Sequence, residues 1–113
     1  MEVRQIIVNS HNDEGFKVVH EYGEWKVGIL NYNERFSKFK ELENHTLTDE
    51  FFILVKGSAT LYTESEKVEM EISKSYTVPA NVWHHIVVSK DAKVIVIENK
   101  NTSKDNTLKK FFD

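Results

Sequence analysis

Two carboxylates and two histidines in this sequence have a spacing that favours a shared site. Glu43 and His45 are two residues apart, so their side chains would point to the same face of a β-strand. Glu50 stands at the head of an apolar stretch, and a hairpin at residues 46–49 would bring it back beside them. His84 opens another apolar stretch farther along the chain. The spacing of the first three residues favours a shared site, and a barrel that also enclosed His84 would add a second imidazole to it.

Imidazole and carboxylate donors in one place are typical of a divalent metal site. Nitrogen and oxygen ligands together accept Zn, Mn, Fe, Ni or Co, and two histidines with one carboxylate match the facial triad of non-haem iron. Ionised carboxylates inside a protein are costly unless a cation or hydrogen bonds compensate them. We expect a divalent metal ion at Glu43, His45, Glu50 and His84.

Each of these residues also has an ordinary structural explanation. Glu43 can be a solvated charge at a strand edge, His45 a loop histidine, and Glu50 a carboxylate bonded to a loop amide. His84 competes with His85, because only one of two successive strand residues faces inward. We expect the other two histidines of the chain to lie at the surface or in an interface. They are His11 and His20.

Short strands would have to carry these residues. The apolar stretches are rich in Val, Ile and aromatic residues, and turn-forming residues separate them, a pattern typical of a sandwich or barrel. The stretches are residues 3–8, 16–19, 25–30, 51–55, 59–62, 68–72, 76–78, 83–88 and 94–97. Residues 51–55 and 94–97 are apolar on both faces, so one face needs a further layer or a second subunit. We therefore expect a homodimer.

Two segments have a less regular pattern. Phe36 and Phe39, three residues apart, favour a helical turn within residues 34–42, with an irregular strand as the alternative. Residues 105–113 predict a short helix, capped by Asp105 or Asn106. This helix would dock through its apolar residues. They are Leu108, Phe111 and Phe112.

The stretch that contains the first three candidate ligands resembles the first cupin motif. Residues 43–50, followed after six further residues by Gly57, place His45 and Glu50 on the second histidine and the glutamate of that motif. Residues 79–84 resemble the second motif, proline-x-glycine-x-x-histidine. The resemblance covers residues 25–99.

This resemblance implies an all-β fold, a cupin-type double-stranded β-helix or jelly-roll barrel with a short C-terminal helix or tail. Residues 1–113 would form a single domain. It also implies that His84 is the ligand of the second motif, so that His85 faces outward with Trp83.

The chain departs from the cupin pattern at four places. Glu43 replaces the first histidine, which shifts the metal preference toward harder ions such as Mn or Fe. Asn81 and Ser73 stand where the pattern has glycines, and Asn can still adopt a left-handed turn. Val88 replaces an asparagine.

Several functions fit a small cupin. The first is a metal-dependent enzyme, such as an isomerase, dioxygenase, decarboxylase or lyase, in which Glu43 completes the ligand set or acts as a base. The second is a non-catalytic module that binds a small sugar or acid, with or without metal. A weaker third is a purely structural dimerisation unit. The fold does not decide among them.

Composition limits the classes of partner that we expect. The formal net charge is -3, from 15 basic and 18 acidic residues, so we expect neither nucleic acid nor an anionic membrane as a partner. The absence of cysteine excludes disulfides and thiol catalysis. No signal peptide or membrane-spanning stretch is visible. We expect a cytoplasmic protein that binds a small molecule.

Overall fold

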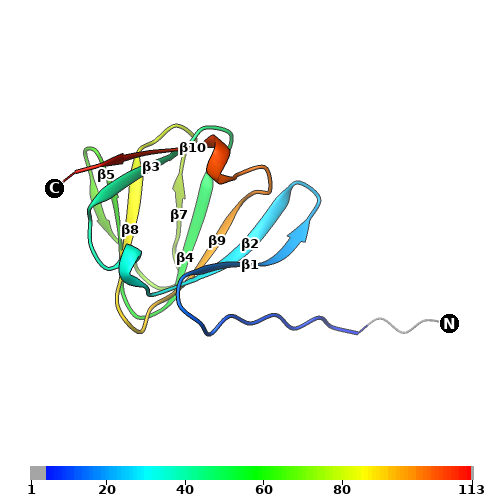
Figure 1. Cartoon of the computed structure of the whole chain (residues 1–113). Coiled ribbons are helices and arrows are strands. Elements are labelled where there is room, and N and C mark those ends of the chain that lie inside the picture. The colour runs from blue at the N-terminus through cyan, green and yellow to red at the C-terminus, as the bar shows by residue number, and fades with distance from the viewer. Residues whose placement is uncertain (1–4, 113) are drawn as a thin grey trace.

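The computed structural model describes residues 5–112, which form two five-stranded antiparallel sheets (Figure 1). The strands are β1 (Phe16–Tyr22), β2 (Trp25–Asn31), β3 (Glu41–His45), β4 (Glu50–Lys56), β5 (Ala59–Thr63), β6 (Lys67–Glu69), β7 (Ser75–Val78), β8 (His84–Val88), β9 (Lys93–Asn99) and β10 (Thr107–Phe111). Two short 3-10 turns, η1 (Glu34–Phe36) and η2 (Lys104–Asn106), connect them. The expected all-β cupin jelly-roll fold is confirmed.

The strand order mixes distant parts of the chain. The first sheet runs β1-β2-β9-β4-β7 and the second runs β10-β3-β8-β5-β6. Consecutive strands therefore often lie in opposite sheets, as in a jelly roll. This crossing places residues from β3, β4, β8 and β9 around one interior.

Alternation along the strands builds the core between the sheets. On β4, Phe52 and Leu54 point inward and are 3% and 2% exposed, and on β9 Val94 and Val96 are 0% and 3% exposed. Burial of each such side chain stabilises the fold by about 1.5–3 kcal/mol. The inward positions at one end of the same strands are Glu50 and Glu98, which pair directly across β4 and β9. One end of the barrel is therefore apolar and the other is polar.

The outer face of the first sheet is also apolar. Its residues form two rows across β2, β9 and β4. All of them are half-buried, because only neighbouring side chains of the same face cover them. The rows are Val27, Ile97 and Phe51, and Ile29, Ile95 and Ile53. Trp25, at the end of the same face, is 52% exposed.

Turn geometry explains two departures from the cupin glycines. Asn81 has a φ of 69°, so the expected left-handed turn is confirmed, and Ser73 has a φ of 77°. Serine adopts this left-handed backbone conformation less readily than asparagine. Gly57, which the chain keeps, has a φ of 75°, and a side chain there would collide with Ala92.

The C-terminal segment differs from expectation. The predicted helix over residues 105–113 is wrong: after η2, residues Thr107–Phe111 form strand β10, which pairs with β3. Asp113 lies outside the described residues. Pairing supplies hydrogen-bond partners to the open edge of β3, which a helix could not do. Phe111 is 73% exposed and does not dock, whereas Phe112 packs edge-on against Phe39.

The N-terminal expectations are met in part. The stretch over residues 3–8 forms no strand in its described part, and residues 3 and 4 lie outside the described residues. Ile6, Ile7 and Val8 are 92%, 77% and 86% exposed, on a segment that extends away from the sheets (Figure 1). His11 is buried, not at the surface, and its ring Nε2 lies 2.8 Å from the Gly15 carbonyl oxygen. His20 is exposed, as expected.

The other irregular segment behaves as predicted. The helical turn expected within residues 34–42 is η1, which is followed by β3. Among residues 5–112, no helix has the length and apolar character needed to cross a membrane.

Candidate metal centre

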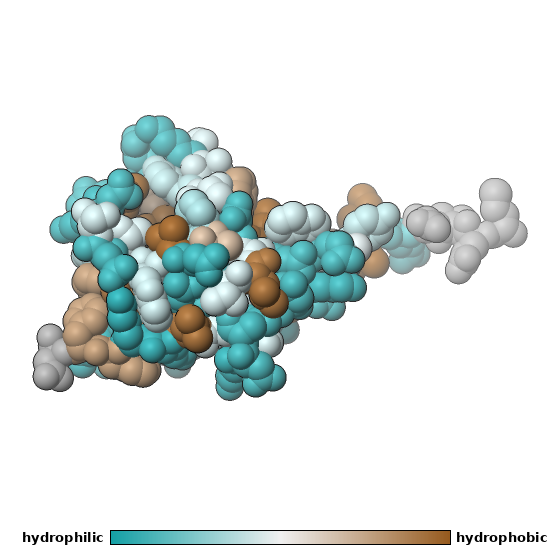
Figure 2. Space-filling view, turned by 90° about the horizontal axis from the view of Figure 1, so that it is seen from above, coloured by the Kyte–Doolittle hydropathy of each residue, from teal (hydrophilic) through white to brown (hydrophobic). Residues whose placement is uncertain are grey.

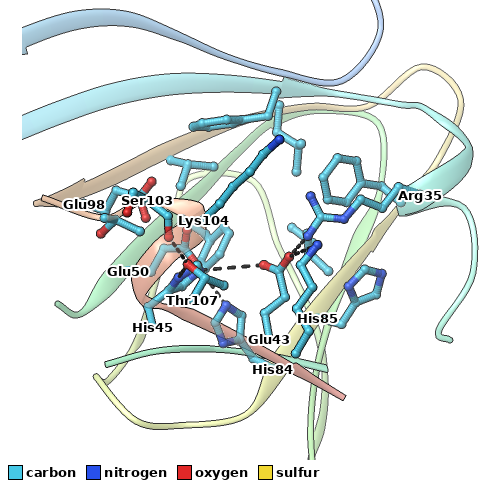
Figure 3. Close-up of a pocket in the computed structure, with 18 residues that line it drawn as sticks. Arg35, Glu43, His45, Glu50, His84, His85, Glu98, Ser103, Lys104 and Thr107 are labelled. Atoms are coloured by element: carbon cyan, nitrogen blue, oxygen red, sulfur yellow. Dashed lines mark hydrogen bonds and ion pairs between the residues drawn. The ribbon is translucent and has the colours of Figure 1, made fainter. Parts of the chain in front are cut away.

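The polar end of the barrel gathers side chains from both sheets. Glu50 comes from the first sheet, whereas Glu43 and His84 form a direct cross-strand pair in the second. His45, also on β3, shares the face of Glu43 because two residues separate them. The four residues predicted as metal ligands therefore converge from β3, β4 and β8 (Figure 3).

His84 is held by both ring nitrogens. Nδ1 lies 2.9 Å from the backbone oxygen of Val82, and Nε2 lies 2.8 Å from Oε1 of Glu50. A carbonyl oxygen only accepts hydrogen bonds, so Nδ1 carries the proton. Nε2 can donate to Glu50 only while it also carries a proton, and loss of that proton would free its lone pair for a metal ion.

His45 has a similar arrangement. Its Nε2 lies 3.3 Å from Oε1 of Glu50 and 3.7 Å from Oε2 of Glu43. Its Nδ1 lies 3.1 Å from the hydroxyl oxygen of Thr107 on β10. Both imidazoles thus direct Nε2 at the same carboxylate oxygen.

Glu43 faces two cations as well as His45. Its Oε1 forms an ion pair with Arg35, and Nζ of Lys109 lies 3.8 Å from the same oxygen. Arg35 also donates from Nε to Oε1 of Glu41, at 3.1 Å. Glu43 therefore has one oxygen toward the basic side of the site and the other toward His45.

Glu98 is a fifth site residue that the sequence analysis missed. It is 5% exposed, its Oε2 has no hydrogen-bond partner among the described residues, and Nζ of Lys26 is 3.8 Å from Oε1. Burial, together with the negative charge of Glu50, raises its pKa to about 8. Its place in the alternation after Val94 and Val96 was a usable signal, because it makes Glu98 an inward carboxylate.

The electrostatics couple the imidazoles to Glu50. Burial alone would raise the pKa of Glu50, but hydrogen bonds to His45 and His84 hold it well below its usual range. Burial likewise disfavours the charged form of His45, yet the contact with Glu50 leaves the pKa of His45 raised. Glu50 is thus an anion that attracts positive charge between itself and the two rings.

These donors fit a divalent cation. Two overlapping groups have ligand atoms within 4.8 Å of one another: Glu43, His45 and His84, and His45, Glu50 and Glu98. Both rings offer Nε2 while an oxygen atom faces Nδ1, and Oε2 of Glu98 is buried without a partner. The set combines nitrogen and oxygen donors, which Zn, Mn, Fe, Ni and Co accept.

His85 corrects one expectation. It takes the face of β8 opposite His84, because it pairs with Tyr62, but it is only 3% exposed. The rings of Phe36 and Phe39 lie over it, with centroids 6.1 and 6.3 Å away. It therefore does not reach the surface, and although it lies on the face of β8 opposite His84, it still borders the cavity.

Comparison with known families agrees with this geometry. Residues 37–98, more than half of the chain, match the model described as "Cupin domain". The chain belongs to the cupin family. Five of the converging residues lie inside the matched segment of this cupin, whereas Arg35, Thr107 and Lys109 lie outside it. The five are Glu43, His45, Glu50, His84 and Glu98.

Solved structures resemble this cupin in fold. A cupin-2 domain protein of Shewanella frigidimarina has 20% identity and a TM-score of 0.67, over 80% of this chain and 85% of that chain. A single-substitution variant of Streptomyces PAC13 with uridine has 15% identity and a TM-score of 0.69, over 96% of this chain and 93% of that chain. PAC13 is described as a nucleoside dehydratase. KdgF of Halomonas has 17% identity and a TM-score of 0.62, over 80% of each chain. The search of curated proteins found no match.

A cavity of about 540 Å³ opens onto the cluster. This size falls in the range of small-molecule sites, about 300–1,000 Å³. One wall carries the polar cluster and the other is apolar. The apolar lining is Phe16, Leu30, Phe36, Phe52, Ile86 and Val96.

Proposed function

We propose that this cupin binds a divalent metal ion through His45, Glu50 and His84 and holds a small polar ligand in the adjoining cavity. The arrangement that carries the proposal is the approach of two Nε2 atoms to one oxygen of Glu50, at 3.3 and 2.8 Å. Because an oxygen atom faces each Nδ1, both lone pairs can turn to a common cation. Glu43 and Glu98 are the further carboxylates of the site.

Without a metal, protons must take the place of the cation. The raised pKa of His45 and of Glu98 shows where positive charge or a proton is favoured. A bound metal would supply a Lewis acid that polarises an oxygen of the ligand. The apolar wall of the cavity would exclude water, and Arg35 with Lys109 would hold the carboxylate of Glu43 at the edge of the site.

The cavity favours a small ligand with polar groups at one end. Its polar wall would orient the ligand and its apolar wall would contact the rest. PAC13 is similar in fold and has been seen with uridine, which supports a ligand of about this size. Isomerase, dioxygenase and lyase activity are the proposed reactions, with Glu43 as ligand or base. Non-catalytic binding of a sugar or acid is the alternative.

Metal analysis tests the proposal. Protein purified without an affinity tag, after incubation with each candidate divalent ion and removal of excess, is analysed by mass spectrometry of the elements. We expect about one metal per chain, and the same for His20→Ala, which changes an exposed histidine away from the site. Less than about 0.1 metal per chain with every ion would overturn the proposal.

We also propose a homodimer, formed through the apolar outer face of the first sheet. The two rows of apolar side chains on this face and Trp25 are the surface that a second copy would cover. Figure 2 shows apolar atoms on the projecting N-terminal segment, whose Ile6, Ile7 and Val8 are further exposed apolar residues. A cytoplasmic location and the absence of nucleic-acid binding stay predictions.

Light scattering during size-exclusion chromatography tests the dimer. Phe51→Glu places a charge in the middle of the apolar face and should yield a monomer. Ile72→Glu is the matched control, because Ile72 is an exposed apolar residue away from that face, 56% exposed. A wild-type protein that stays monomeric at about 100 μM would contradict the proposal.

A further inference from the structure

Strand β10 places a hydroxyl beside one of the two site histidines. Thr107 is the direct cross-strand partner of His45, so the two side chains lie on the same face of the second sheet. We propose that Thr107 is a positioning residue that accepts a hydrogen bond from Nδ1 of His45 and so fixes the ring with Nε2 toward Glu50. The expected effect on metal binding rests on the proposed function, whereas the hydrogen bond between Thr107 and His45 does not.

The direction of the hydrogen bonds follows from the single proton of a hydroxyl. Oγ1 of Thr107 lies 2.7 Å from the backbone oxygen of Ser103 and 3.1 Å from Nδ1 of His45. The carbonyl can only accept, so the hydroxyl donates its proton to Ser103. The oxygen of Thr107 is then an acceptor, and His45 must donate from Nδ1. A hydroxyl that donated to Nδ1 instead would leave the Ser103 carbonyl without this donor.

The turn η2 holds this carbonyl in place. The side chain of Ser103 accepts from the backbone N–H of Asp105, at 3.2 Å, and the side chain of Asn106 accepts from the backbone N–H of Ser103, at 3.0 Å. Asn106 also donates from Nδ2 to the backbone oxygen of Asn101, at 2.7 Å. These bonds form a capping box that orients the carbonyl four residues before Thr107.

The two site histidines thus differ in how their rings are oriented. His84 donates to a backbone oxygen, that of Val82, which no side-chain substitution removes. His45 depends on a side chain of β10, outside residues 37–98 that match the cupin family. A change at Thr107 should therefore act on His45 and leave His84 unaffected.

Nitrogen NMR of the metal-free protein tests this hydrogen bond directly. Spectra are recorded at about pH 5.5, where an imidazole carries both ring protons. In wild type and Thr107→Ser the Nδ1 proton of His45 should exchange slowly with water, whereas in Thr107→Val it should exchange faster. The Nδ1 proton of His84 should not change. An unchanged exchange rate for His45 in Thr107→Val would overturn the inference.

Metal titration measures the consequence. We expect Thr107→Val to bind the metal about 10–100-fold more weakly than wild type, and Thr107→Ser to restore binding to within about threefold. Thr60→Val, on β5 of the same sheet as Thr107, is the control for the loss of a strand hydroxyl. Equal affinity in Thr107→Val and wild type would also overturn the inference. If no variant binds metal, the proposed function fails, while the exchange of the Nδ1 proton still decides the role of Thr107.

Discussion

Strand β8 presents two neighbouring histidines to two different environments. His84 and His85 are almost equally buried, at 4% and 3% exposed. On the inner face, both ring nitrogens of His84 have polar partners, whereas on the outer face Nε2 of His85 has none among the described residues. His85 lies instead between aromatic rings. Burial therefore does not separate a candidate ligand from a packing residue, but the partners of the ring do.

The same contrast holds for charge. Burial lowers the pKa of His85. Glu41 acts to raise this pKa and Arg35 acts to lower it, so the two charges do not compensate for the loss of water. His45 on the inner face is similarly buried, yet Glu50 reverses the direction of its shift. One carboxylate thus decides whether a buried imidazole favours or resists positive charge.

Replacing each β8 histidine in turn should give opposite phenotypes. His84→Ala removes a ligand and should weaken metal binding by at least about 100-fold. His85→Ala should keep metal binding within about threefold but lower the free energy of unfolding by about 2–3 kcal/mol, because it leaves a cavity between aromatic rings. Calorimetric metal titration and urea unfolding measure the two effects. Loss of metal in His85→Ala alone would reverse the assignment of the two faces.

The inner face should make the metal-free protein less stable as the pH rises. The pKa of Glu98 is about 8 in the folded protein and 4.5 when unperturbed. Below both values the carboxyl is protonated in both states. Between them the unfolded state loses its proton first, so stability falls with rising pH, by up to about 1.4 kcal/mol per pH unit from this group.

Glu98→Gln tests this dependence. The amide cannot ionise, so at pH about 8 the metal-free variant should be more stable than wild type by about 2–4 kcal/mol. Urea unfolding at several pH values measures the difference. Saturating metal should reduce it, since a cation compensates the ionised carboxylate. A metal-free wild type whose stability does not fall between these pKa values would contradict the expectation.

The outer face should have the opposite pH dependence. Since the folded-state pKa of His85 lies below 6.5, the unfolded state takes up the proton first as the pH falls. Stability is therefore lost below about pH 6.5, by no more than about 1.4 kcal/mol per pH unit. His85→Phe keeps the aromatic packing and should remove this loss. Both proteins are compared in a Glu98→Gln background, so that the remaining inner-face groups contribute equally to each. Equal acid sensitivity of the two proteins would count against this expectation.

A change away from both faces should alter stability alone. Ser73 has a φ of 77°, which glycine adopts without strain. Ser73→Gly should raise the free energy of unfolding by about 0.5–1 kcal/mol and leave metal affinity unchanged. Asn81→Gly is the comparison, and its effect should be smaller because asparagine tolerates this conformation. Thermal unfolding ranks the two variants, and a destabilised Ser73→Gly would show that its hydroxyl matters more than the turn.

Parts of the candidate site could be predicted because they are local. Glu43, His45 and Glu50 lie within eight positions of one another, and strand alternation across a hairpin suffices to bring them together. His85 could be assigned to the opposite face of β8 for the same reason. The burial of His85 could not be predicted, because the ring of Phe39 that covers it comes from an irregular segment far away in the sequence.

Other parts depend on contacts that no local pattern contains. Thr107 reaches His45 only because residues after η2 form a strand rather than the expected helix, and the open edge of β3 favours the strand. Glu98 meets Glu50 only because β9 pairs with β4. Arg35 and Lys109 are far apart in the sequence and approach Glu43 from η1 and β10.

The sequence by itself determined the strand pattern, the cupin fold and the residues of the two motifs, because alternation and short-range turns are properties of neighbouring residues. The tertiary structure alone decided which atoms face each imidazole nitrogen, which carboxylate resists ionisation and which cations face Glu43. These properties depend on distances between strands that are far apart in the chain. A pattern of residue types does not contain such distances.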